Sequence, residues 1–490
     1  MKSRVDLPAF RHIDLENGWI ISYHQDLPVF YDEDRKIALI GYAWQVMPGR
    51  GTPYEEIGKL EPDEEGSVPE EKILEMEETW SGRYVLLHGT RVYTDASGLM
   101  GVFYCTSGIS CDLGILAESM GLDQVSYKAM RYLNWMPGPL TPYEGIKRLL
   151  PSQTYDLDSS SVEGREILAT SYDSLPDDAA RTDRFIELFG HLLKEIAGSI
   201  GERKLLIALS GGYDSRCGFS AAINAGLDFS AFTFQHDVMS EGDYLLPGKL
   251  CKKTGTEYIF INRDKDRYDE EAERSYQRYA GGIDGGLVRD EDRLFYAYHQ
   301  YHDLVKRFGD IVVLRGGIWE AAKGYMNPLF NGDRISPDYY LQLGVPEDSL
   351  EKRSLDEYFA WCDAHPVTGL NQSERLFLEQ QGGCWLSYIE HGFDCDDSIF
   401  TVQPLNSRIL LSIVMDYPEK ERLDKEHQVQ IALKACSETA DVPYADDRKI
   451  MGETRAARVI RNLKRALYRT KNMGILGTVR YYIKRMSDKR

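Results

Sequence analysis

A short glycine-rich turn at residues 210–215 holds the residue types best suited to chemistry. It reads Ser-Gly-Gly-Tyr-Asp-Ser and lies between an apolar run and a helical pattern. Backbone N–H groups at the start of a helix bind anions, and glycine lets a ligand come close to the backbone. A carboxylate in such a turn needs a cation such as Mg²⁺ before it can face phosphate. The turn therefore predicts a site for a nucleoside triphosphate with Mg²⁺ on Asp214, and its predicted nucleotide-binding residues are Ser210, Gly211, Gly212, Asp214 and Ser215.

A unit of parallel strands and helices has to position this turn. Apolar residues recur at helical spacing over 185–200, and the continuous apolar strand 205–209 leads directly into the turn. A helix over 217–225 and strands at 230–234 and 258–261 follow. This β-α-β-α-β alternation is typical of an open, doubly wound parallel sheet. The turn is then expected at the carboxyl end of the first strand.

The residues before this unit have a different pattern. Short β-rich runs at 19–23, 37–45, 84–87 and 101–104 alternate with turn signals and predict a sheet-rich α+β domain. The polar stretch that follows has too little apolar content to form a core, which indicates a linker. The predicted division is a first domain at 1–173, a linker at 174–184, the nucleotide domain at 185–450 and a tail at 451–490.

Composition narrows the class of protein. The 490 residues include 42% hydrophobic side chains, enough for two to three domains, and the formal charge of −20 disfavours a nucleic-acid binder. The sequence has no apolar run of the roughly 18 residues that a membrane span needs, and its start lacks the apolar core of a signal peptide. We therefore expect a cytoplasmic protein. The eight cysteines form no Cys-x-x-Cys pair, so neither a disulfide framework nor a zinc cage is indicated.

The tail differs sharply in charge from the rest. Residues 451–490 hold 12 basic and 2 acidic side chains. Apolar residues at helical spacing predict two amphipathic basic helices. One interpretation is peripheral contact with an anionic membrane or polymer, and the other is docking on the acidic body of the protein.

Ser-Gly-Gly-x-Asp-Ser after an apolar strand resembles the pyrophosphate loop of the N-type ATP pyrophosphatases. Enzymes of that class adenylate an oxygen of their substrate and let a nucleophile displace AMP. The segments 80–86, 93–99, 146–152 and 403–410 are similar in order and spacing to asparagine synthetases and β-lactam synthetase. The resemblance implies an α/β protein with a glutaminase-like (Ntn-type) first domain and an ATP-pyrophosphatase domain with a helical C-terminal extension.

The chain departs from this family at two places. The family's glutaminase nucleophile is a cysteine next to the initiator methionine, whereas Lys2 stands here and no cysteine precedes Cys105. We therefore expect no glutaminase activity. The segment 313–325 is similar to Leu-Ser-Gly-(Asp/Glu)-Gly-x-Asp-Glu-x-x-x-Gly-Tyr, but one residue is missing and Trp319 stands where the family has a metal-binding Asp.

Three further site residues follow from the resemblance. Glu320 matches the final Glu of that motif and is the predicted catalytic acid or base. Lys449 lies where the family has a lysine that neutralises phosphate charge during adenylation. Asp243 either faces the nucleotide or caps a helix.

The predicted activity is ATP-dependent amide or amidine formation. A small-molecule or peptide carboxylate would be adenylated and attacked by ammonia or an amine, without a nucleic-acid partner; a homodimer is an expected assembly. One alternative is a non-catalytic nucleotide-binding or interaction relative, because the acidic motif around 316–320 is altered. A sulfur-transferring enzyme acting on RNA is a second alternative, which the acidic body and the cysteine spacing oppose. A third is a glycine turn that binds no nucleotide.

Overall fold

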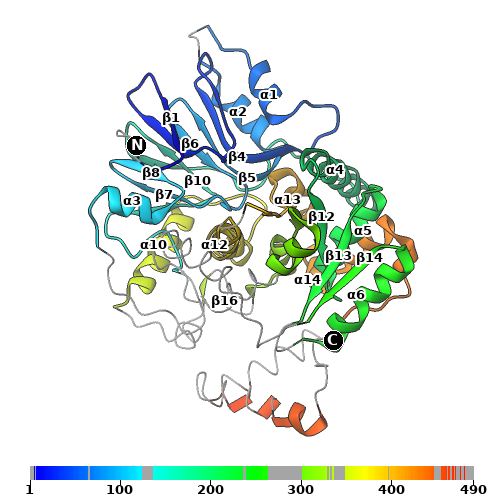
Figure 1. Ribbon diagram of the computed structural model, residues 1–490. Helices are drawn as coiled ribbons and strands as arrows, with labels where there is room; N and C mark the ends of the chain where they lie inside the picture. The colour runs from blue at the N-terminus through cyan, green and yellow to red at the C-terminus, as the bar shows by residue number, and fades with distance from the viewer. Residues whose placement is uncertain are drawn as a thin grey trace.

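The computed structural model describes most of the chain (Figure 1). The described residues are all except 1–4, 6, 65–66, 124–135, 236–238, 263–300, 328–329, 332–333, 336–347, 395–396, 446–453, 461, 464–465, 468–469, 471–474, 476–478 and 480–490. Lys449 is therefore outside the described residues. None of the helices in the described ranges combines the length and apolar content that a membrane span requires.

The first part of the chain, up to residue 173, is built mainly from antiparallel strands. A six-stranded sheet has the order β11-β10-β6-β5-β4-β3, and smaller sheets are formed by β1-β2 and β8-β7-β9. The prediction of a sheet-rich α+β part is confirmed; its glutaminase-like character stays a prediction. The elements are β1 (Phe10–Asp14), β2 (Ile20–His24), β3 (Val29–Asp32), β4 (Ile37–Gln45), α1 (Pro53–Lys59), α2 (Glu70–Glu77), β5 (Trp80–His88), β6 (Arg91–Thr94), β7 (Val102–Cys105), β8 (Gly108–Ser110), α3 (Leu113–Ser119), β9 (Lys147–Leu149), β10 (Gln153–Asp156) and β11 (Ser161–Gly164).

The second part surrounds a five-stranded parallel sheet with the order β14-β13-β12-β15-β18. The predicted parallel sheet is thus confirmed. Its elements are α4 (Asp178–Ser199), β12 (Lys204–Ala208), α5 (Tyr213–Asn224), β13 (Ser230–Phe234), α6 (Glu241–Thr254), β14 (Glu257–Ile261), β15 (Ile311–Leu314), the 3₁₀ helix η1 (Gly317–Lys323), β16 (Phe330–Asn331), β17 (Arg334–Ile335), α10 (Leu350–Ala364), α11 (Gln372–Leu376), the π-helix η3 (Phe377–Leu386), α12 (Ser387–Phe393), β18 (Ile399–Val402), α13 (Arg408–Met415), α14 (Glu419–Asp424), α15 (Glu426–Ala435) and η4 (Ser437–Thr439).

Both faces of the parallel sheet are buried, as is usual for parallel sheets, which carry helices on both sides. Successive side chains of a strand therefore enter different apolar clusters. Leu205 and Ile207 of β12 belong to one apolar cluster, which also contains residues of α4, α5 and α13. Leu206 points to the other face and belongs to a second cluster with residues of α12 and of the first part. The covered faces confirm the doubly wound arrangement and leave the ends of the strands as the place for a ligand.

Helix α4 begins inside the stretch predicted as a linker. The Asp177 side chain accepts a hydrogen bond from Ala180 N at 2.8 Å, which caps the helix and fixes its start. Residues 178–184 therefore form the first turns of α4 rather than an extended segment. The division into domains remains a prediction.

Buried hydrogen bonds join the two parts. Asn406 donates to the Asp95 carboxylate at 2.8 Å and accepts from Ser97 Oγ at 2.6 Å. Arg408 lies 3.2 Å from the Glu77 carboxylate and donates to the carbonyl oxygen of Ile167 at 2.8 Å. The similar segments near residues 80–99 and 403–410 thus meet in space and hold the parts together.

The tail is helical wherever it is described between residues 455 and 479. Val459, Ile460, Leu463 and Leu467 are 57%, 56%, 60% and 61% exposed. In Figure 1 the orange-red helical pieces of the tail lie below the rest of the described chain. The described residues thus leave these four apolar side chains largely uncovered, and both docking on the body and membrane contact stay predictions.

Candidate functional site

The predicted ATP turn lies at the carboxyl edge of the parallel sheet. It follows β12, whose neighbours in the sheet are β13 on one side and β15 on the other. The chain proceeds from β12 to β13 and only later to β15, so the strand order reverses between β12 and β15. Ligands of open α/β sheets bind at this switch point.

Hydroxyl groups shape the turn from within. The Oγ atoms of Ser210 and Ser215 lie 3.0 Å apart, and Ser215 Oγ also accepts from Ser210 N at 3.0 Å. Gly212 N donates to Ser210 Oγ at 3.1 Å. Helix α5 starts after Gly212 without a side-chain cap. Its first N–H groups therefore point at the turn with the positive end of the helix dipole behind them.

Asp243 connects the turn to the start of α6. Its Oδ1 accepts a hydrogen bond from Gly211 N at 2.8 Å, and its Oδ2 accepts one from Ser240 Oγ at 2.8 Å. Ser240 is the N-cap of α6 and accepts from Asp243 N at 2.9 Å. Asp243 thus takes part in capping α6 and also contacts the backbone of the turn. Its position is compatible with both predicted roles, which are helix capping and facing a nucleotide.

Asp214 is held by two residues that the sequence did not single out. Its Oδ2 accepts from Lys323 Nζ at 2.7 Å, and its Oδ1 accepts from Gln428 Nε2 at 2.7 Å. Lys323 Nζ also donates to Glu320 Oε1 at 2.8 Å. Residues from η1 and α15 therefore meet at the Asp214 carboxylate of α5.

The charges of this cluster shift one another. Burial, followed by the nearby Asp214 carboxylate, raises the pKa of Glu320. Burial alone would lower the pKa of Lys323, but Asp214 and Glu320 outweigh it and the pKa is raised. The ammonium therefore stays charged at neutral pH between its two carboxylates.

The acidic side chains of this cluster are arranged differently from the ligands that Mg²⁺ requires. Mg²⁺ takes oxygen ligands at about 2.0–2.1 Å with near-octahedral geometry. Both Asp214 oxygens already accept hydrogen bonds, and the described residues include no group of three His, Cys, Asp or Glu side chains placed to hold a metal. As arranged, the residues do not fit a resident Mg²⁺ ion.

A segment after η4 crosses the turn. Ala445 N donates to Gly211 O at 2.9 Å, and Arg216 donates to the carbonyl oxygens of Val442 and Pro443 at 2.7 Å. The Arg216 guanidinium carbon lies 3.8 Å from the centre of the Tyr444 ring. We call residues 442–445 the strap. The strap is fixed to the turn and to the first helical turn of α5.

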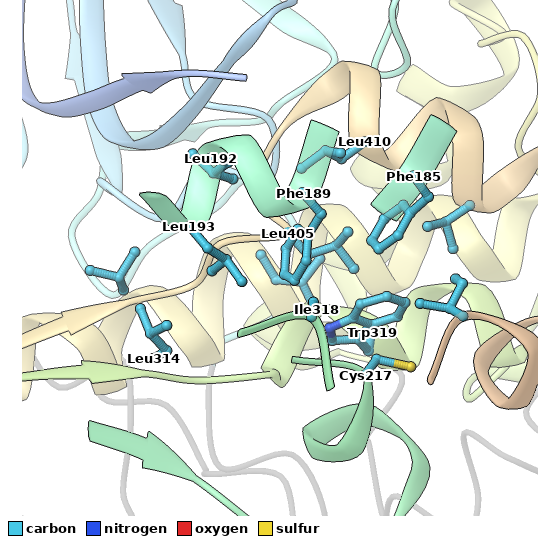
Figure 2. Packing of buried hydrophobic residues seen from close by; sticks show 14 of the residues in the cluster. Phe185, Phe189, Leu192, Leu193, Cys217, Leu314, Ile318, Trp319, Leu405 and Leu410 are labelled. Atoms are coloured by element: carbon cyan, nitrogen blue, oxygen red, sulfur yellow. The ribbon is translucent and has the colours of Figure 1, made fainter. Parts of the chain in front are cut away.

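Trp319 does not line the site. It is 2% exposed and packs edge-on against Phe185 and Phe189 of α4, with ring centroids 5.3 and 6.1 Å away. Figure 2 shows its indole ring beside these rings and near Cys217. The residue that stands where the family has a metal-binding Asp is thus part of the core.

Hydrogen bonds connect the predicted site residues that the structure describes. Serine hydroxyls link the turn, Asp243 contacts Gly211, and Lys323 joins Asp214 to Glu320. Lys323 was missed although it follows Glu320 by one helical turn, a spacing that places two side chains on one face. Gln428 and Tyr444 carry no local signal in the sequence.

No family model matches the chain, and no curated protein matches it. Several solved structures share weak similarity. A glutamine-dependent NAD⁺ synthetase from Acinetobacter baumannii, solved with ADP, is 15% identical with a TM-score of 0.21, over 36% of this chain and 31% of that chain. An NMN synthetase from Francisella tularensis is 14% identical with a TM-score of 0.21, over 42% of this chain and 93% of that chain. The U34-tRNA thiolase NcsA from Methanococcus maripaludis is 12% identical with a TM-score of 0.26, over 62% and 80%. The chain spans less than a third of the first structure, and TM-scores of this size support no conclusion about activity.

Proposed function

We propose that the protein is an ATP-dependent ligase that forms a carbon–nitrogen bond, with the triphosphate of ATP at the turn 210–215. The observation that carries the proposal is the uncapped start of α5, directly after Ser-Gly-Gly at the switch point of a parallel sheet. The Ser210 and Ser215 hydroxyls and the Lys323 ammonium lie beside it. They offer the donors that phosphate oxygens require.

The reaction would proceed in two displacements. A carboxylate oxygen of the substrate attacks the α-phosphorus of ATP, and the bond to pyrophosphate breaks. The nitrogen of ammonia or an amine then attacks the carbonyl carbon, AMP leaves, and the nitrogen loses a proton. Glu320, whose pKa burial raises, is the group best suited to accept that proton. The acid is a small molecule or a peptide, and ammonia or an amine is the direct donor.

Pyrophosphate release tests the proposal. Purified protein incubated with ATP, ammonium chloride and pools of carboxylic acids is expected to release pyrophosphate and AMP in equal amounts. Asp214→Asn should remove the activity. Asp228→Asn makes the same charge change at a side chain that is 100% exposed, and it should leave the activity unchanged. Failure of the wild-type protein to bind ATP would contradict the proposal.

A second function is favoured by a specific observation. Gly211 N and both oxygens of Asp214 already have internal partners, as in a turn held closed without a ligand. A nucleotide-binding or interaction protein without catalysis would keep this arrangement. It predicts that ATP binds and is recovered intact with every acid pool.

A further inference from the structure

Lys323 places a positive charge where the family resemblance expects a metal ion. Its Nζ lies 2.7 Å from Asp214 Oδ2 and 2.8 Å from Glu320 Oε1. The side chain is 9% exposed, and those of Asp214 and Glu320 are 20% and 34% exposed. The Lys323 side chain is therefore mostly buried, while its two carboxylate partners are more exposed.

We propose that the Lys323 ammonium is the resident cation of this site, in place of a divalent metal, and that it contacts the nucleotide phosphate directly. The second half of this statement rests on the proposed function, whereas the first half does not. Lys323 would make the turn attractive to a polyanion without a metal ion bound by the protein.

The donors of the ammonium support a role in binding. A lysine ammonium has three N–H donors, and two of them point at Asp214 and Glu320. No described residue accepts the third. A phosphate oxygen at the turn can accept it, which gives a charge-assisted hydrogen bond.

The surroundings explain why a metal is excluded. An ammonium nitrogen at hydrogen-bond distance from both carboxylates already supplies the positive charge that an ion would bring to them. Gln428 holds the second oxygen of Asp214 at 2.7 Å, so this carboxylate cannot turn toward an ion without losing that bond. Trp319, at the family's metal-binding position, lies in the core. The chain thus has an apolar residue where the resemblance implies an acid, and Lys323 stands four residues later.

Mn²⁺ binding without nucleotide tests the first half. Electron paramagnetic resonance counts the free ion during a titration of protein. The wild-type protein is expected to take up no Mn²⁺ at this site, so Asp214→Asn should leave its titration unchanged. Lys323→Ala should gain one Mn²⁺ per chain with affinity raised about tenfold or more, and adding Asp214→Asn should remove that gain. The proposal would be overturned if the wild-type protein bound Mn²⁺ and Asp214→Asn abolished this binding. It would also be overturned if Lys323→Ala bound no more Mn²⁺ than the wild type.

Two controls keep the result interpretable. Lys323→Met fills the same volume without charge, so it should not gain Mn²⁺ to the extent of Lys323→Ala. Thermal melting establishes that each variant is folded, and if Lys323→Ala does not fold, the comparison of wild type with Asp214→Asn still decides.

ATP binding tests the second half. With EDTA present, the wild-type Kd for ATP should stay within about threefold of its value with Mg²⁺, and Lys323→Ala should weaken binding about tenfold. An unchanged Kd in Lys323→Ala would overturn the phosphate contact. If the wild-type protein bound no ATP under either condition, the proposed function would fail while the Mn²⁺ result would stand.

Discussion

The ring of Tyr444 lies flat on the ring of Tyr213, with centroids 4.1 Å apart and 4° between the planes. The Arg216 guanidinium carbon lies 3.8 Å from the centre of the Tyr444 ring, and Lys425 Nζ lies 4.7 Å from the centre of the Tyr213 ring. Each ring of the pair thus has a cation–π contact. The stack joins the strap to the turn proposed to bind ATP.

Removing one ring should loosen the strap. We expect Tyr444→Ala to lower the free energy of unfolding by about 1–3 kcal/mol, because both the ring pair and the cation–π contact are lost. It should also weaken ATP binding. Tyr444→Phe keeps both ring contacts and should resemble the wild type. Urea unfolding and equilibrium binding of ATP measure the two effects, and equal behaviour of the alanine and phenylalanine variants would contradict the expectation.

The two glycines of the turn should tolerate a methyl group differently. A Cβ on Gly211 would lie 2.8 Å from Gly242 O and 3.0 Å from Ala445 Cβ, which the backbone of α6 and the strap cannot easily avoid. A Cβ on Gly212 meets only Ser210 Oγ, at 3.2 Å. Gly211→Ala should therefore cost about 1–3 kcal/mol of stability, and Gly212→Ala less. Thermal melting of the pair checks this order, and a larger loss in Gly212→Ala would refute it.

Arg408 should be essential for stability. It is 1% exposed, and its guanidinium pairs with Glu77, which also binds Arg165 at 2.7 Å. Arg408→Ala leaves the Glu77 carboxylate with less compensation in the interior, so we expect a loss of about 3–5 kcal/mol. Arg408→Lys keeps the positive charge but loses the planar set of guanidinium donors, so it should restore only part of the stability lost in Arg408→Ala. Urea unfolding measures both, and a loss below about 1 kcal/mol for alanine would argue against this role.

His427 should make stability depend on pH. Its side chain is buried, and burial lowers its pKa from 6.5 to about 4. As the pH falls from 6.5 toward 4, the unfolded chain takes up a proton that the native state excludes. Stability is thus present above 6.5 and declines through this window, by up to about 3 kcal/mol at 1.36 kcal/mol per pKa unit. His427→Phe should flatten the decline in unfolding experiments at stepped pH, and an unchanged slope would contradict the assignment.

Local patterns were sufficient to predict strands in both parts of the chain. The strand expected at 230–234 matches β13, and the strand expected at 37–45 matches β4 (Ile37–Gln45). Apolar alternation and helical spacing act over a few residues, so a sequence displays them directly. The helix expected at 217–225 begins earlier, at Tyr213, because the turn itself supplies the first residues of α5.

Contacts between distant segments could not be predicted in this way. Lys323 reaches Asp214 across 109 positions, and Gln428 reaches it across 214. Such pairs depend on β15 lying beside β12 and on α15 packing against α5, which no local spacing encodes. The similar family motif specifies the positions of Glu320 and Trp319. Lys323, which pairs with Asp214, stands at a position where the motif allows any residue.

The buried guanidinium of Arg408 has a consequence for any attempt to shorten the protein. Its partners are carbonyl oxygens and a carboxylate contributed by residues before 173. In a fragment that lacks those residues, the Arg408 guanidinium would lose these partners. The Asn406 side-chain amide would also lose the Asp95 carboxylate that accepts its hydrogen bond. We therefore expect the second part of the chain to be unstable without the first, because the first part supplies the partners of this buried charge.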